Sequence, residues 1–140
     1  MLLKFGSNHT VRGPSLTNTY ELGHFVSEFA HSQGTTAFNI LLVVARGTQN
    51  MFRPFGSTPA DLQKNWNATT SASDNGELNI AVAIAAAGEH AALLDLRPRL
   101  ADMSNGRLKV TDGTFARLLR SYDAVVVIPV AHASTLIVNP

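Results

Sequence analysis

The chain has 140 residues, which is the size of one domain and enough to bury a core without disulfides. Charged residues make up 15% of it and the net charge is +1, so we expect neither a nucleic-acid partner nor an acidic membrane surface. The absence of cysteine excludes disulfide scaffolds, thiol catalysis and cysteine-based zinc sites.

The first residues carry no signal for export or membrane insertion. Leu2, Leu3 and Phe5 are followed by glycine, serine and asparagine instead of a long apolar region. The longest apolar run falls well short of the roughly 20 residues that span a bilayer. We therefore expect no signal peptide, no membrane partner and a cytoplasmic or virion location.

Residues 1–18 form an extended N-terminal arm in this interpretation, and residues 19–140 form a single α+β domain. The arm contains Gly6, Gly13 and Pro14 among small polar residues, without helical periodicity. Irregular segments of this length are uncommon in compact domains. Either the arm is a loosely held terminus, or it reaches a neighbouring subunit.

A helix is predicted from Thr19 to about Ser32. Its inward face is expected to consist of residues at helical spacing: Leu22, Phe25, Val26, Phe29 and Ala30. The other flank carries Glu21, His24, Glu28 and His31, spaced three, four and three apart. Such a stripe either presents metal ligands or is a solvated surface with i,i+3 and i,i+4 pairs. We expect a solvated surface, and therefore no metal and no cofactor.

Residues 36–45 are apolar on both faces and predict a central strand. The loop that follows holds Phe52 and Phe55, which either tuck onto the core or offer an anchor to a partner. A short helix is expected from Ser57 or Thr58 to Trp66. Residues 78–86 alternate and favour a strand, although alanine-rich helical spacing is the alternative.

Residues 91–96 form either a short helix or the return strand of a hairpin, and residues 98–106 are expected to be irregular. A strand is predicted at 107–111. Asp112 then caps a helix whose inward stripe is Phe115, Leu118, Leu119 and Tyr122. The connection is just long enough for a crossover to a parallel strand.

The densest β-branched run is 123–130, and we expect a buried strand from Ala124 to Ile128. Pro129 lacks an N–H and marks a bulge or the exit of the chain. Residues 134–138 form the last strand, a candidate sheet edge. Together these elements predict an α+β domain with a mixed sheet of about five strands and two to four short helices packed on it.

No catalytic motif is present: the chain has no Gly-rich phosphate loop, G-x-S-x-G elbow, H-E-x-x-H sequence or EF-hand loop. The catalytic residues are therefore unknown. The enzyme hypothesis is a small pocket in which His24, His90 or His132 acts as general base beside a carboxylate. We favour a non-enzymatic structural protein that self-associates or docks on a larger scaffold.

Four features favour assembly: sparse charge, a long arm whose only charged residues are Lys4 and Arg12, an aromatic loop and an apolar strand at 134–138. The expected partners are copies of itself or a larger protein assembly. The interface candidates are Phe52, Phe55, Leu136, Ile137 and Val138. With Ser/Thr/Asn-rich loops, no cysteine and an extended arm, the composition resembles that of small virion assembly proteins such as capsid cement or tail components.

Overall fold

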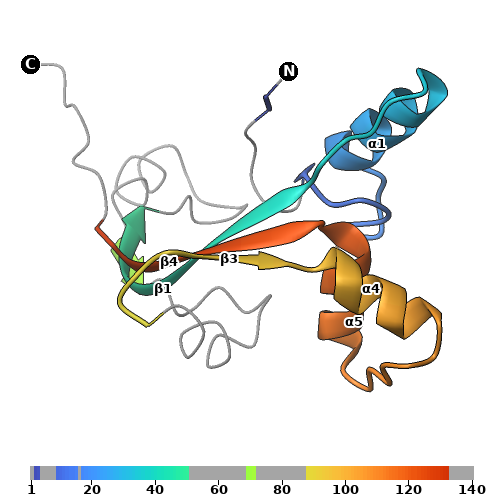
Figure 1. Ribbon diagram of the computed structural model, residues 1–140. Helices are drawn as coiled ribbons and strands as arrows, with labels where there is room; N and C mark the ends of the chain where they lie inside the picture. Colours follow the sequence, from blue (N-terminus) through green and yellow to red (C-terminus); the bar gives the residue numbers. More distant parts are fainter. Residues whose placement is uncertain (1, 4–8, 16, 51–68, 72–87, 133–140) are drawn as a thin grey trace, which may run out of the picture.

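The computed structural model describes residues 2–3, 9–15, 17–50, 69–71 and 88–132, which form three helices and a four-stranded mixed sheet (Figure 1). In chain order the elements are α1 (Leu22–Ser32), β1 (Ile40–Asn50), β2 (Thr69–Ser71), β3 (Ala92–Asp95), α4 (Arg97–Ser104), α5 (Gly113–Ser121) and β4 (Ala124–Ala131). The α+β class is as predicted. The strands expected at 78–86 and 134–138 and the helix ending at Trp66 lie outside the described residues, so the count of about five strands stays a prediction.

The sheet has the order β2-β1-β4-β3 and is built around the parallel pair β1 and β4. Leu41 lies opposite Val125 and Val43 opposite Val127 in this pair. β3 pairs antiparallel with β4, and β2 pairs antiparallel with β1. The two central strands are the β-branched runs of the sequence, whose side chains pack well on a pleated surface.

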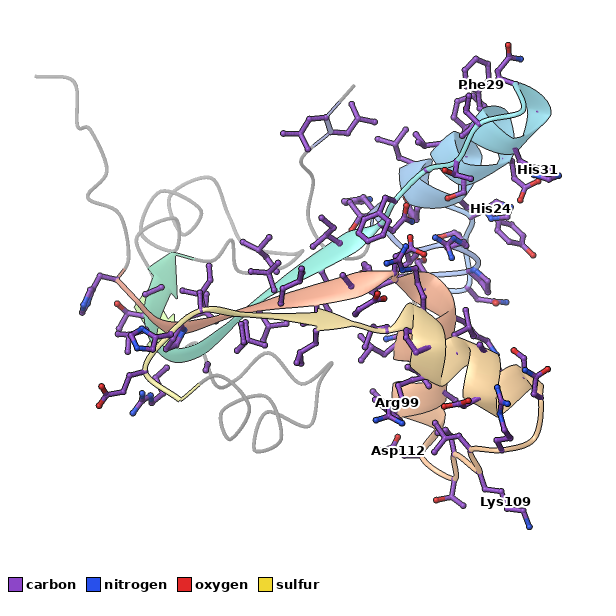
Figure 2. All side chains as sticks on the ribbon, in the orientation of Figure 1. His24, Phe29, His31, Arg99, Lys109 and Asp112 are labelled. Carbon is purple, nitrogen blue, oxygen red and sulfur yellow. The ribbon has the colours of Figure 1, made fainter. Side chains whose placement is uncertain are left out.

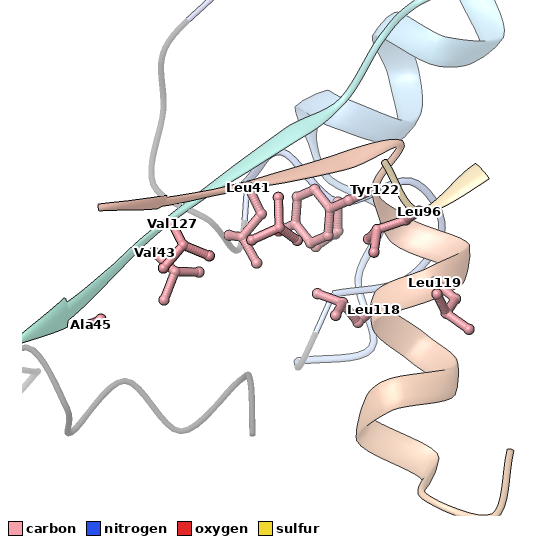
Figure 3. Close-up of a cluster of buried hydrophobic side chains, with 10 residues drawn as sticks. Leu41, Val43, Ala45, Leu96, Leu118, Leu119, Tyr122 and Val127 are labelled. Atoms are coloured by element: carbon pink, nitrogen blue, oxygen red, sulfur yellow. The ribbon is translucent and has the colours of Figure 1, made fainter. Parts of the chain in front are cut away.

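The core lies on one face of this sheet and reaches α5 at one end of the strands (Figure 3). Leu118 and Leu119 of α5 belong to the same buried cluster as Val43 of β1 and Val125 and Val127 of β4. The full cluster of buried residues is Val11, Leu41, Val43, Ala45, Leu96, Leu118, Leu119, Tyr122, Val125 and Val127. Alternate residues of β1 and β4 therefore face the core, as the period of two in a strand requires.

Helix α5 begins as the sequence predicts. The Asp112 carboxylate accepts hydrogen bonds from the backbone N–H groups of Thr114 and Phe115, at 2.8 and 3.2 Å. Of the predicted inward stripe, Leu118, Leu119 and Tyr122 are buried, but Phe115 is exposed. Phe115 lies in the first turn, beyond the reach of the core.

Two predictions between β3 and α5 are wrong. Residues 97–104 form α4 instead of an irregular segment, because Pro98 lies in the first turn, where a helix needs no N–H donor. Residues 107–111 are not a strand. The N–H groups of Arg107 and Leu108 bond to the Asp102 carbonyl, so these residues close α4 in a turn. The segment expected at 91–96 is the strand β3.

The predicted exit at Pro129 is also wrong, because β4 continues to Ala131. Its pairing with β3 ends at Val127, whereas its pairing with β1 resumes at Val130. Pro129 has no N–H to donate, and it is tolerated in β4 because the pairing with β3 has already ended at this position. The buried strand is therefore longer than predicted by three residues.

Helix α1 does not bury the face that its periodicity predicts. Phe25 is 64% exposed, Phe29 is 58% exposed, and no residue of the helix is buried. Figure 1 shows α1 projecting away from the sheet. The helix rests on residues 9–15 through its Gly23 side, where a Cβ would collide with the Thr10 carbonyl group. Close backbone approach at a glycine decides which side of α1 is in contact.

We predict that Gly47→Ala lowers the free energy of unfolding by about 2 kcal/mol or more. Gly47 has φ +106°, and a Cβ there would run into the carbonyl oxygen of Ala131 on β4. Gly34→Ala is the control, because Gly34 has φ +66° but no atom near its would-be Cβ. Backbone strain alone should lower the free energy of unfolding of Gly34→Ala by about 1 kcal/mol, measured by urea unfolding. Equal losses for the two variants would contradict a clash at Gly47.

Candidate binding groove

Residues 9–15 are docked on the domain. Val11 is buried in the core, and the Arg12 N–H donates to the carbonyl of Ser121 at 3.2 Å. The side chain of Asn39 donates to the Thr10 carbonyl at 3.0 Å. This part of the predicted arm therefore packs on its own domain. Residues 4–8 lie outside the described residues, so contact between the arm and a neighbouring subunit stays a prediction.

Asp123 joins four parts of the chain at the end of α5. Its carboxylate accepts hydrogen bonds from Arg12 Nη2 at 2.5 Å and from the Asn39 N–H at 2.8 Å. Its own N–H donates to the Asn39 carbonyl at 2.8 Å, and its carbonyl accepts from the Leu96 N–H at 2.8 Å. Because Asp123 is only 9% exposed, its bonds are formed in a poorly solvated place, where an unpaired charge is costly.

A groove of about 410 Å³ opens beside this junction. One wall is α1, the base is the connection from α1 to β1, and the far end is the Arg12–Asp123 pair with the start of α4. Its lining residues are Arg12, Ser27, Glu28, His31, Thr35, Thr36, Ala37, Phe38, Arg97 and Asp123. Figure 2 shows the labelled His31 on α1. The volume is in the range of small-ligand and peptide sites.

The two guanidinium groups in the groove are both neutralised. Arg12 pairs with Asp123, while Arg97 binds Asp95 through Nε at 2.9 Å and Nη2 at 2.7 Å. Hydrogen bonds from the Arg97 side chain and backbone lower the pKa of Asp95 to about 2, and Asp95 in turn raises the pKa of Arg97. The Arg97 guanidinium also lies 5.2 Å from the centre of the Phe38 ring, a cation–π distance.

Glu28 is a charged residue of the groove that has no partner among the described residues. No hydrogen bond or ion pair within the described ranges involves its carboxylate, and its side chain is exposed on α1. The neighbouring His31 shares the wall without bonding to it. Counting charges with His31 neutral, the two arginines balance Asp123 and Asp95, so Glu28 leaves the surroundings with an excess of one negative charge.

The backbone of residues 36–38, which line the groove, has no hydrogen-bond partner among the described residues. Thr35 donates to the Ala30 carbonyl and Asn39 bonds to Asp123, but between them no backbone hydrogen bond involves Thr36, Ala37 or Phe38 in the described part of the chain. Figure 1 shows this connection continuing the line of β1 toward α1. It is a short strand-like edge without a partner strand among the described residues.

Within the described residues, none of the histidines expected to act as a general base pairs with a carboxylate. His24 Nδ1 accepts from the Gly13 N–H at 3.3 Å, and its ring lies 4.5 Å from that of Tyr20. His90 and His132 are exposed. Among the described residues, the His–carboxylate contact is between His9 and Glu21, at 3.1 Å on the surface. It is the main cause of the lowered pKa of Glu21, with a further hydrogen bond from Thr19.

The Glu21, His24, Glu28 and His31 stripe does not converge on one point. Glu21 is turned to His9 and Thr19, and His24 is turned to Gly13. No three histidine or acidic side chains among the residues that the structure describes lie close enough to share a metal ion. The five interface candidates Phe52, Phe55, Leu136, Ile137 and Val138 lie outside the described ranges, so their role stays a prediction.

The sequence did not reveal Arg12 and Asp123 as partners, because they are separated by 111 residues. One signal was available: Asp123 stands between a buried tyrosine and the most apolar run of the chain. A carboxylate in such surroundings needs a cationic or N–H partner. Local patterns do not indicate which of the eight arginines and three lysines is that partner.

Comparison with protein families, curated proteins and solved structures finds no match to this chain. None of the helices in the described ranges is long and apolar enough to cross a bilayer.

We predict that Asp123→Ala lowers the free energy of unfolding by about 3 kcal/mol, because Arg12 and the Asn39 N–H lose their shared acceptor in a buried place. Asp102→Ala is the control. Asp102 contacts Arg99 and Arg107 on the surface, so its loss should cost under about 1 kcal/mol. Urea unfolding at neutral pH measures both. Similar losses in the two variants would contradict the central role of Asp123.

A second prediction concerns acid. Folding lowers the pKa of Asp95 from 3.8 to about 2, so the folded state binds fewer protons than the unfolded state in that window. The stabilisation by the Asp95–Arg97 pair is complete above the unfolded-state pKa of 3.8, and it is lost as the pH falls through the folded-state pKa of about 2. Asp95→Asn should flatten this part of the stability-against-pH curve. The effect should be small and shrink in salt because the pair is exposed; an unchanged curve would contradict it.

Proposed function

We propose that this protein is a non-enzymatic assembly protein that self-associates or docks on a larger scaffold, as virion cement or tail components do. The observation that carries the proposal is an apolar sheet face that no described helix covers. We call it the open face. Its residues, on β1, β4 and β3, are Ile40, Leu42, Val44, Val126, Ile128 and Leu93.

The centre of the open face is a row across three strands. Leu42 pairs with Val126, and Val126 pairs with Leu93. Leu42 is 61% exposed and Leu93 is 67% exposed. On the other face of the sheet, the row that is offset by one residue along each strand includes Leu41 and Val125, which are buried in the core cluster.

Isolated exposed leucines are ordinary on protein surfaces, but adjoining ones mark contact sites. Burying a leucine side chain contributes about 1.5–3 kcal/mol, so the row gives association a substantial driving force. The exposed pair of Phe25 and Phe29, with ring centres 6.2 Å apart, adds a second apolar surface on α1. No described His–carboxylate pair in a pocket favours the enzyme alternative.

We predict that the wild-type chain, of 15.0 kDa, behaves as an oligomer at micromolar concentration in size-exclusion chromatography with light scattering. Leu93→Lys should raise the dissociation constant by about tenfold or more, because it places a charge in the apolar row. Its stability should change little, since Leu93 is exposed.

Ala101→Lys is the matched control, because it adds the same charge at an exposed position of α4, away from the open face. It should leave the mass unchanged. A wild-type monomer across the micromolar range would refute self-association, and equal effects of the two lysines would refute the open face as its site.

A further inference from the structure

We propose that the groove binds an extended peptide segment of a partner protein, with a basic side chain that pairs with Glu28. The inference rests on the proposed assembly role and deepens it by naming the chemistry of the scaffold segment. Three features of the groove support it: a backbone segment and a carboxylate that have no partner among the described residues, and one end that is joined by hydrogen bonds.

The backbone of Thr36, Ala37 and Phe38 has the direction and the available hydrogen-bonding groups that strand addition requires, as far as the described residues show. These residues continue the line of β1, yet no hydrogen bond in the described ranges involves their N–H or C=O groups. An extended peptide beside them would pair with these groups as a further strand, a common mode of peptide recognition. Main-chain pairing supplies affinity without requiring a particular sequence.

The charge preference follows from Glu28. Both arginines in the groove already have carboxylate partners, so an acidic peptide would gain little from them. Glu28 has none among the described residues, and it lies on the α1 wall across from the unpaired backbone. A lysine or arginine of the peptide is therefore the side chain that the groove complements.

The end of the groove is rigid. Arg12, Asp123 and Asn39 are joined by hydrogen bonds of 2.5–2.8 Å, and Phe38 is covered on one side by Arg97. A site whose walls are held in place before binding loses less entropy on binding. This preorganisation favours the groove over the exposed face of α1 as the place for a short peptide.

Fluorescence anisotropy with blocked, labelled pentapeptides tests the inference. The probes have threonine and valine at the outer positions and a central lysine, glutamine or glutamate. The lysine probe should bind most tightly and the glutamate probe most weakly. A lysine probe with alternate backbone nitrogens methylated should lose at least about fivefold in affinity, because it lacks ladder donors.

Two pairs of variants test the protein side. Ala37→Pro removes one N–H and should weaken the lysine probe about fivefold, whereas Ala37→Thr keeps the N–H and should not. Glu28→Gln should remove the preference for lysine over glutamine, whereas Glu89→Gln, in an exposed turn outside the groove, should retain it. Circular dichroism melting identifies any variant that fails to fold, and the methylated probe tests the ladder on the wild-type protein.

Absence of binding by every probe, or no loss on methylation, would overturn the inference while leaving self-association untouched. Conversely, if the wild type is a monomer and binds the lysine probe, the result would support peptide binding in the groove and would refute only the self-association. If Ala37→Pro instead abolished self-association and no probe bound, the groove's occupant would be a second copy, and a separate partner would be excluded.

Discussion

The structure depends on the hydrogen bonds of one buried carboxylate. Asp123 lies between α5 and β4. Its backbone and side chain hold the start of β1 at Asn39, the start of α4 at Leu96 and the N-terminal segment at Arg12. Removing a carboxylate from water is costly, and the guanidinium and N–H donors offset that cost. The parallel register of β1 and β4 begins directly beyond this junction.

The same junction explains why the groove exists. The N–H and the carbonyl of Asn39 both form hydrogen bonds with Asp123, so the pairing between β1 and β4 starts at Ile40. The residues before it, Thr36 to Phe38, extend past the beginning of β4 and have no strand beside them among the described residues. The buried ion pair closes one end of the opening, and α1 forms its wall. Fold stability and the candidate site therefore share one set of contacts.

The two faces of the sheet have opposite surroundings. On one face Val125 and Val127 are buried, in the cluster that includes Leu118 and Leu119 of α5. On the other face Leu42 and Leu93 are exposed. Both faces are apolar in sequence, and their unequal exposure is the basis for the proposed assembly role.

The sequence by itself determined the local elements with strong signals: the Asp112 cap, the buried part of the predicted inward stripe (Leu118, Leu119 and Tyr122), and two β-branched strands. These strands were predicted at 36–45 and 124–128, and the structure places them at Ile40–Asn50 and Ala124–Ala131. These local elements follow from periodicity and capping, which act over a few residues. Only the tertiary structure decided that Phe25 and Phe29 stay exposed, that Arg12 pairs with Asp123, and which sheet face is covered. Such outcomes depend on contacts between distant residues, which local patterns do not encode.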